Sequence, residues 1–147
     1  MNVKFLYIII LILVLSFVAI ALFNHTAPRT SKSNMLHTGI VSIGNQSYKV
    51  FIAENLSEQK QGLMNYTNLS KNGIAGELFI NIPNHACFWM KNTPEPITQS
   101  WIDNGIVVYT YNAIPYNTNS VCANGTSVIE LMPGIKIHVN QTMNEVI

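Results

Sequence analysis

The sequence predicts a mainly β protein, a compact antiparallel barrel-like or sandwich domain with one short helix, preceded by a single N-terminal transmembrane helix. Three observations lead to this fold class. Residues 5–23 are apolar except for Ser16, short β-rich runs separated by turn residues fill the rest of the chain, and clear helix-start signals occur once after the apolar run. Many short strands with frequent turn signals are typical of barrels and sandwiches.

Residues 5–23 form the first predicted element, a membrane anchor. A bilayer core requires about 20 apolar residues in a helix, and this run has that length without a charge. A cleaved signal peptide is the alternative, with Ala19–Ala21 as a small-residue cleavage site, but its apolar stretch is usually shorter. We therefore divide the chain into a tail (1–4), an anchor or uncleaved signal (5–23), a polar stalk (24–38) and an extracytoplasmic β domain (39–147).

The strands of the β domain are predicted from runs rich in β-branched, aromatic and other apolar residues between turn residues. In chain order these are Gly39–Ile43, Tyr48–Ala53, Glu77–Ile82, Ala86–Asn92, Gln99–Asp103, Ile106–Ile114, Ser127–Met132 and a terminal strand near Val146.

Local turn and cap signals connect these strands. Residues 44–47 join the first two strands in a predicted hairpin, and Asp103-Asn104-Gly105 is a strong hairpin signal between two apolar runs. A short helix over Glu58–Gln61 is expected, with Asn55 or Ser57 as its N-cap. Prolines mark several of the remaining breaks between strands.

The low charge of the chain limits its partners. Charged residues make up 10% of the sequence, against about 25% in a typical soluble domain. The net charge is +1, and no cluster of lysine and arginine follows the apolar run. A nucleic-acid partner is therefore not expected, because phosphate recognition requires a basic surface.

Asparagine glycosylation signals are unusually frequent. Seven of the 18 asparagines stand in Asn-x-Ser/Thr frames, well above the number expected by chance. Glycans on an extracytoplasmic surface would supply the solubility that the missing charges do not, whereas an Asn-rich composition with accidental frames is the alternative. Asn24 adjoins the anchor and Asn140 could be buried. The glycosylation candidates are Asn45, Asn55, Asn65, Asn68, Asn124 and Asn140.

Several motifs of the β domain resemble one uncharacterised family. Phe88–Thr93 reads F-W-M-K-N-T, and Gly62–Met64 reads G-L-M. With Gly76–Phe79 (similar to G-M-L-F), Trp101–Asp103 (similar to F-I-D) and Val128–Leu131 (similar to V-L-E-L), these motifs resemble the family called domain of unknown function 192. The resemblance runs from about Gly39 to the C-terminus and implies a small β-rich domain behind a signal peptide or anchor, with no established activity.

This sequence departs from the family pattern at two polar positions. Asn65 and Tyr66 stand where an arginine often follows G-L-M, and Thr98 replaces the aspartate of I-P-L-D. If the family's site is a cluster of that arginine, that aspartate and the signature lysine, Lys91 is its one remaining charge here.

The end of the signature strand is the best candidate for a site. Alternation places Cys87, Trp89 and Lys91 on one face of the strand and Phe88, Met90 and Asn92 on the other. Both faces are bulky and apolar up to Met90, so the body of the strand should be central in its sheet and its polar end should lie at a rim.

Polar side chains at this rim could form a small-ligand pocket. Lysine would supply a point charge and tryptophan a stacking face. The alternative is structural: the lysine stem packs along Trp89, and the next two residues form a turn. Glu130 could pair with Lys91 as a structural lock. The ligand-binding candidates are Trp89, Lys91, Asn92, Thr93 and Glu130.

Patterns for catalysis are scarce. The sequence shows no paired carboxylates, no nucleophile elbow, no H-E-x-x-H motif and no phosphate-binding glycine loop. Asp103, the single aspartate, stands in a turn, and a nucleophile pair of Cys87 with His85 or His138 lacks an orienting third residue. We therefore favour a domain that is not an enzyme, and no cofactor is expected.

The two cysteines leave two interpretations open. A disulfide between Cys87 and Cys122 would suit an oxidising compartment, and two free buried cysteines are the alternative. His85 and Cys87 share a strand face and could bind copper, with Met90 as a third ligand type. Met90 points to the opposite face, however, and a disulfide would remove the thiolate.

Together these observations predict a membrane-anchored, single-pass protein whose C-terminal domain lies outside the cytoplasm. The favoured hypothesis is that it acts as a non-catalytic surface binding or structural module. The membrane is one expected partner, and a glycan or surface protein is another. The alternatives are a ligand-binding or enzymatic domain with a polar pocket at Lys91-Asn92-Thr93, and an extracytoplasmic copper-binding protein.

Overall fold

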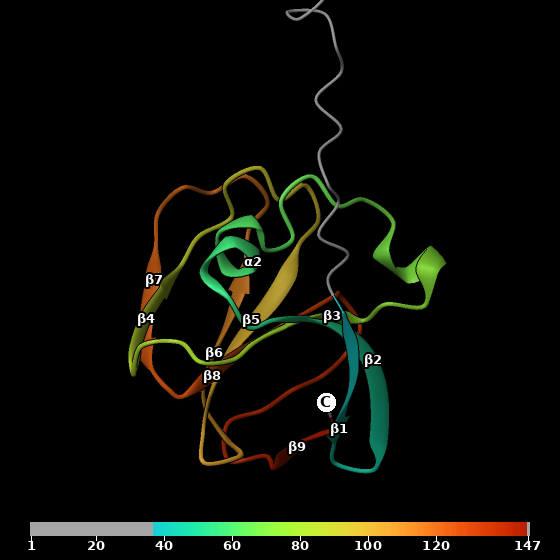
Figure 1. The fold of residues 1–147 in the computed structure, drawn as a ribbon, viewed down its shortest axis with the longest axis vertical. Helices are drawn as coiled ribbons and strands as arrows, with labels where there is room; N and C mark the ends of the chain where they lie inside the picture. The colour runs from blue at the N-terminus through green and yellow to red at the C-terminus, as the bar shows by residue number, and fades with distance from the viewer. Residues whose placement is uncertain (1–36, 147) are drawn as a thin grey trace, which may run out of the picture. The chain divides into compact units, whose positions relative to one another are not determined.

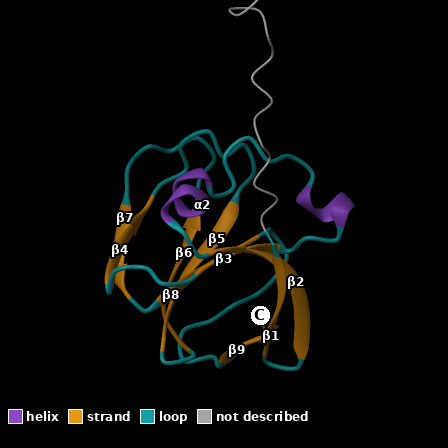
Figure 2. Cartoon of the chain, viewed as in Figure 1, coloured by secondary structure: helices purple, strands orange, loops and turns teal. Residues whose placement is uncertain are grey.

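The computed structural model describes residues 37–146 (Figures 1 and 2). The predicted tail and anchor, almost all of the stalk and the sequon at Asn24 lie outside the described residues. Among the residues that are described, no helix is long and apolar enough to cross a membrane.

The domain is mainly β, as predicted, and its strands form two sheets. The large sheet has seven strands in the order β6-β5-β8-β3-β2-β1-β9, and β4 pairs with β7 in a separate two-stranded ribbon. The strands are β1 (Thr38–Ile43), β2 (Gln46–Ala53), β3 (Gly76–Phe79), β4 (His85–Phe88), β5 (Ile97–Asp103), β6 (Ile106–Ala113), β7 (Val121–Asn124), β8 (Ser127–Leu131) and β9 (Met143–Val146).

The predicted hairpins form where the local turn signals stand. β1 and β2 pair from Thr38↔Phe51 to Ile43↔Gln46, and Gly44 takes the positive φ that the tight turn requires. Between β5 and β6, Asn104 and Gly105 both have positive φ, which is the backbone of the turn favoured in two-residue hairpins.

The short helix is α2 (Leu56–Gln61), and Asn55 caps it. The Asn55 side chain accepts hydrogen bonds from the backbone nitrogens of Ser57 and Glu58, while the Glu58 carboxylate accepts from the backbone of Asn55. This reciprocal arrangement satisfies helix N–H groups that would otherwise be unpaired. A 3₁₀ turn, η1 (Leu69–Asn72), follows and was not predicted.

The purely antiparallel prediction is wrong at one pair of strands. β2 and β3 run parallel, with Phe51 opposite Glu77 and Ala53 opposite Phe79. Parallel neighbours require a long crossover connection, and residues 54–75, which contain α2 and η1, supply it.

The large sheet curls into a half-barrel whose two outermost strands approach each other. Ile106 at the start of β6 forms a bridge with Thr142, just before β9. The backbone nitrogen of Asn140 donates to Val107, and that of Met143 donates to Gly105. Figure 1 shows the ribbon of β4 and β7 on one side of the domain and β1 and β2 on the other.

Both faces of the central strands are buried, so the side chains of β3 and β8 lie almost entirely in the interior of the domain. The concave face holds the main core, which includes Val50, Leu78, Ile102 and Ile129. The opposite face carries Phe79, Trp101 and Val128, and segments 62–74 and 88–90 contribute a second group of buried side chains there.

The signature strand differs from its prediction. Instead of a central strand over Ala86–Asn92, β4 ends at Phe88 and belongs to the two-stranded ribbon. The backbone nitrogen of Met90 bonds to Asn117, and Asn92 has a positive φ of 55°, so the chain leaves the strand there. Ribbon partner β7 was not predicted. The alternation of exposed Cys87 and Trp89 with buried Met90 is as expected.

Candidate functional site

A row of side chains crosses five strands on the convex face of the large sheet. The strand registers place Phe51 opposite Glu77, Glu77 opposite Glu130, Glu130 opposite Gln99, and Gln99 opposite Tyr111. Directly opposite residues point to the same face of a sheet. Two carboxylates and one amide therefore lie side by side at the centre of the domain.

All three polar side chains of this row are buried. The exposed fraction is 0% for Glu77, 4% for Glu130 and 1% for Gln99. The Gln99 side-chain nitrogen donates a hydrogen bond of 2.9 Å to Glu130 Oε1. Both carboxylate oxygens of Glu77 are buried without a hydrogen-bond partner, which is rare in folded proteins and costly.

The surroundings of the two carboxyl groups favour their neutral forms. Burial, together with the neighbouring charges of Glu130 and Glu58, raises the pKa of Glu77 to about 9. Burial also raises the pKa of Glu130 to about 7, against the opposing effect of the Gln99 hydrogen bond. Strong shifts caused by burial and a specific charge neighbour are typical of functional sites.

A narrow pocket of about 40 Å³ opens above Glu130. Gly62 forms part of its wall, and a Cβ atom added at Gly62 would lie 3.8 Å from Glu77 Oε2. Gly62 has a φ of 46°, a backbone conformation that favours glycine. The other residues that line the pocket are Gln59, Lys60, Gln61, Leu63, Met64, Phe79, Phe88, Trp89 and Thr93.

The paired carboxylates correct the sequence analysis, which found no such pair. Glu77 and Glu130 are 53 residues apart in the sequence (130 minus 77), and the β3–β8 register alone makes them neighbours. One signal was present: each glutamate stands inside an apolar strand, in G-E-L-F and V-I-E-L. Glu77 also occupies the methionine position of the G-M-L-F motif that this segment resembles.

The five predicted ligand-binding residues separate into two groups. Trp89, Thr93 and Glu130 line the narrow pocket, whereas Lys91 and Asn92 do not and are exposed. The Lys91 ammonium lies 5.2 Å from the centre of the Trp89 ring, as the structural alternative expected. Within residues 37–146 the ion pair that forms is His37–Glu54, so Glu130 does not form the ion pair with Lys91 that was considered.

Cys87 and Cys122 face each other across the ribbon and form a disulfide. His85 lies on the same exposed face, and its Nδ1 is 2.7 Å from the side-chain oxygen of Asn124. The ligand atoms of His85 and the two cysteines lie within 4.8 Å of one another. Because the sulfur atoms are bonded to each other, the thiolate that the copper hypothesis requires is absent from this state.

The asparagines of the six predicted glycosylation sites within the described residues are all exposed. Asn140, for which burial was considered, is among them. Two of them also have structural contacts, since Asn55 caps α2 and Asn124 bonds to His85. Their exposure is the geometry that glycosylation requires, and the modification itself stays a prediction.

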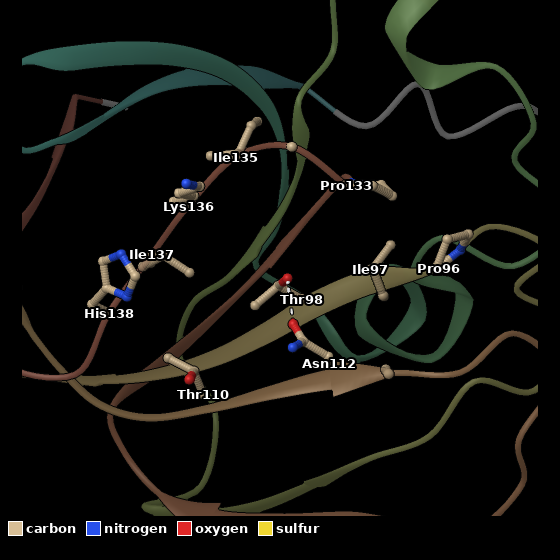
Figure 3. A pocket seen from close by; sticks show the side chains of 12 residues that line it. Pro96, Ile97, Thr98, Thr110, Asn112, Pro133, Ile135, Lys136, Ile137 and His138 are labelled. Carbon is tan, nitrogen blue, oxygen red and sulfur yellow. Dashed lines mark hydrogen bonds between the residues drawn. The ribbon is translucent and has the colours of Figure 1, made fainter.

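A second and larger cavity, of about 670 Å³, lies at the mouth of the half-barrel (Figure 3). We call it the barrel-mouth cavity. One wall consists of β5 and β6, where Thr98 Oγ1 donates a hydrogen bond of 3.0 Å to Asn112 Oδ1. Segment 133–138 forms the facing wall, with Ile135 and Ile137 among its side chains. The cavity combines an apolar lining with a few polar groups.

Lys136 is the charged residue in the lining of the barrel-mouth cavity. Its titratable lining residues are Lys136 and His138, and no acidic side chain lines it. Thr98, which stands at the aspartate position of the I-P-L-D segment, is on its β5 wall. Ser100 pairs with Thr110 of the cavity wall, and its hydroxyl is buried without a partner.

Comparison with solved structures supports this description of the fold. A protein of Sinorhizobium meliloti 1021, described as a candidate transcription regulator, matches with a TM-score of 0.67 and 20% identity over 75% of this chain and 95% of its own. A protein of unknown function from Novosphingobium aromaticivorans matches with a TM-score of 0.66 and 24% identity over 81% and 93%. These likenesses establish a shared fold. No curated protein matches the chain.

The family comparison covers most of the domain and includes all the motifs described above. The profile of the DUF192 family, described as Uncharacterized ACR, matches residues 39–142. The chain therefore belongs to the DUF192 family, as its F-W-M-K-N-T and G-L-M motifs predicted.

Proposed function

We propose that this protein is a membrane-tethered, extracytoplasmic domain that binds a small organic anion in the barrel-mouth cavity. The cavity carries the proposal. Ligand pockets commonly measure about 300 to 1,000 Å³ and combine an apolar lining with a few polar groups. At about 670 Å³, with Ile97, Ile135 and Ile137 beside the Thr98–Asn112 pair, the barrel-mouth cavity fits this description.

The sign of the ligand charge follows from the side chains around the cavity. Lys136 and His138 line it without an acidic counterpart. The neutral Thr98 replaces the aspartate of the family pattern, so a negative charge has been removed from the β5 wall. A positive field favours an anion, and the isoleucines favour an apolar body. An aromatic carboxylate has both properties.

The cellular location is supported by three independent features. Residues 5–23 are long and apolar enough for an anchor. Six sequon asparagines are exposed on the domain, and Cys87 and Cys122 form an exposed disulfide. Persistent disulfides and N-linked glycans both belong to oxidising, extracytoplasmic compartments.

Calorimetric titration of the full chain in detergent micelles tests the anion site. The probes are 2-naphthoate and its uncharged amide. We expect the carboxylate to bind more tightly than the amide, and Lys136→Gln to weaken the carboxylate alone. Thr98→Asp should abolish carboxylate binding, because it returns a negative charge to the wall. Lys60→Gln, at a lysine of α2 that does not line the cavity, should change nothing. Equal binding of both probes, or carboxylate binding unchanged in Thr98→Asp, would refute the proposal.

A further inference from the structure

Glu77 and Glu130 form a buried carboxylate pair that does not line the barrel-mouth cavity, so anion binding there does not explain it. Glu77 has no exposed surface and no hydrogen-bond partner for either oxygen, and Glu130 lies directly opposite. Burying such a group without a partner is costly, and burying two together is more so. Glu77 stands where the motif has a methionine. An apolar residue at this position would avoid the free-energy cost of burying an unpartnered carboxyl group.

The geometry of the pair suits a ligand held between the two side chains. Directly opposite residues of antiparallel strands have Cβ atoms about 4.5 to 5.5 Å apart, so both carboxylates can reach one central atom. Gln99 donates its hydrogen bond to one oxygen of Glu130 and thereby fixes the orientation of that carboxylate. Hard divalent cations prefer carboxylate and amide oxygens as ligands.

The size of the space excludes larger ligands. The narrow pocket has a volume of about 40 Å³, and one water molecule occupies about 30 Å³ in the liquid. An ion with one or two waters fits, whereas an organic cation does not. Gly62 lines this pocket, and a Cβ atom added to it would lie 3.8 Å from Glu77 Oε2, so the Glu77 carboxylate lies close to this wall of the pocket.

We propose that Glu77 and Glu130 bind a hard divalent cation of the Mg²⁺, Mn²⁺ or Ca²⁺ class between their carboxylates, beside the narrow pocket that Glu130 lines, with Gln99 as a positioning residue for Glu130. The cation supplies the partner that both oxygens of Glu77 lack, and it removes the repulsion between the two carboxylates. This site is separate from the barrel-mouth cavity and does not depend on the anion proposed there.

Protons compete with the cation for the same oxygens. The pKa values of about 9 for Glu77 and about 7 for Glu130 mean that binding must displace protons near neutral pH. The other titratable groups facing the pair are Glu58 of α2 and Tyr66, which interact with Glu77, and Lys60, which lines the pocket. Affinity should therefore rise as the pH increases from about 6 to about 8.

Mn²⁺ binding to the full chain tests the proposal. The protein, in detergent micelles, is freed of metal with EDTA and titrated with Mn²⁺ at about pH 8, and free Mn²⁺ is measured by electron paramagnetic resonance. We expect one Mn²⁺ per chain, displaced by excess Mg²⁺ or Ca²⁺. Glu77→Gln and Glu130→Gln should each weaken binding at least about tenfold, because each removes a charged ligand. Glu145→Gln, an exposed carboxylate on β9, is the matched control.

Two further readouts separate loss of the site from loss of the fold. Glu77→Met installs the residue of the family motif, and it should fold at least as stably as the original chain in EDTA yet take up no Mn²⁺. Bound Mn²⁺ should quench the fluorescence of Trp89, which lines the neighbouring pocket, and this component of the quenching should disappear in Trp89→Phe. Absence of saturable uptake at about pH 8, or uptake retained in folded Glu77→Met, would overturn the proposal.

Discussion

The indole nitrogen of Trp101 donates a hydrogen bond of 3.0 Å to the backbone oxygen of Ala86, and this bond joins β5 of the curled sheet to β4 of the ribbon. Trp101 is fully buried, and its ring meets Phe88 of the ribbon edge-on at 5.8 Å between centroids. One side chain thus holds the two sheets together through both a polar and an apolar contact.

Trp101→Phe should lower the free energy of unfolding by about 1 to 3 kcal/mol, because it leaves the buried oxygen of Ala86 without its donor. Urea denaturation followed by circular dichroism measures the change. Trp89→Phe provides the control, since Trp89 is 45% exposed and its replacement should cost less than about 0.5 kcal/mol. Equal effects of the two substitutions would contradict this role of the hydrogen bond.

The raised pKa values of Glu77 and Glu130 predict a stability that falls as the pH rises. Both groups keep their protons in the folded protein at pH values where the unfolded chain, with a pKa near 4.5, has lost them. In EDTA the free energy of unfolding should decrease above pH 4.5, up to about pH 7 through Glu130 and about pH 9 through Glu77. The slope is at most about 1.4 kcal/mol per pH unit for each group.

Glu77→Met isolates the contribution of one carboxyl group to this slope. The variant should be more stable than the original chain at neutral pH, and its stability should vary less between about pH 5 and pH 9. Urea midpoints measured across this range provide the comparison. A pH profile identical in the two proteins would show that Glu77 is not protonated in the folded state.

Gly76→Ala should separate β3 from β8. A Cβ atom at this position would lie 1.8 Å from the backbone oxygen of Glu130, which no side-chain movement can relieve. We expect a loss of about 3 kcal/mol or more in the free energy of unfolding. Gly73→Ala is the matched control: it meets no atom within 4 Å, and its positive φ of 68° should cost only about 1 to 2 kcal/mol. Thermal unfolding of both variants tests the difference.

The disulfide should contribute measurably to stability. It closes a loop with a sequence separation of 35 residues, for which the chain-entropy model gives about 3 to 4 kcal/mol. The double substitution of Cys87 and Cys122 by serine should lower the free energy of unfolding by this amount. A phosphine reductant should destabilise the original chain similarly and leave the double variant unchanged. No response of the original chain to the reductant would contradict the expectation.

Asn55 has two separable roles, one in the helix cap and one as a glycosylation candidate. Asn55→Ala removes both, and should destabilise the domain by about 1 kcal/mol through the lost cap. Asn55→Asp keeps the oxygen that accepts from Ser57 and Glu58 and removes only the sequon. When the protein is produced in a glycosylating host, both variants should lack the mass of the Asn55 glycan relative to the original chain. In unglycosylated protein, Asn55→Ala should unfold at a lower temperature than Asn55→Asp, because only Asn55→Ala loses the helix cap.

The parts of the fold that sequence predicted are those encoded by neighbouring residues. The Asn104-Gly105 turn and the Asn55 cap each involve fewer than five consecutive positions, so propensity and spacing identify them. β7 was missed because Val121–Asn124 is only four residues long, and its strand conformation comes from pairing with β4. The parallel β2–β3 pair was missed because nothing local specifies strand direction.

The site was partly predictable for the same reason. Family motifs led to Trp89, Thr93 and Glu130, which line the narrow pocket. Glu77 was overlooked because its proximity to a second carboxylate depends on the strand register that places Glu130 opposite it. The signal in the sequence that could have identified Glu77 is a charged residue inside an otherwise apolar strand, in G-E-L-F.

The closure of the half-barrel has a consequence for association between copies of the chain. Residues 140–143 bond to the start of β6, and β9 pairs with β1, so one short segment occupies the free edges of both strands. Unpaired strand edges are templates for pairing with another molecule. A cut before Asn140 would therefore leave the outer edges of β6 and β1 unpaired. We expect such a chain to form domain-swapped dimers, in which the segment after the cut site is supplied by a second copy.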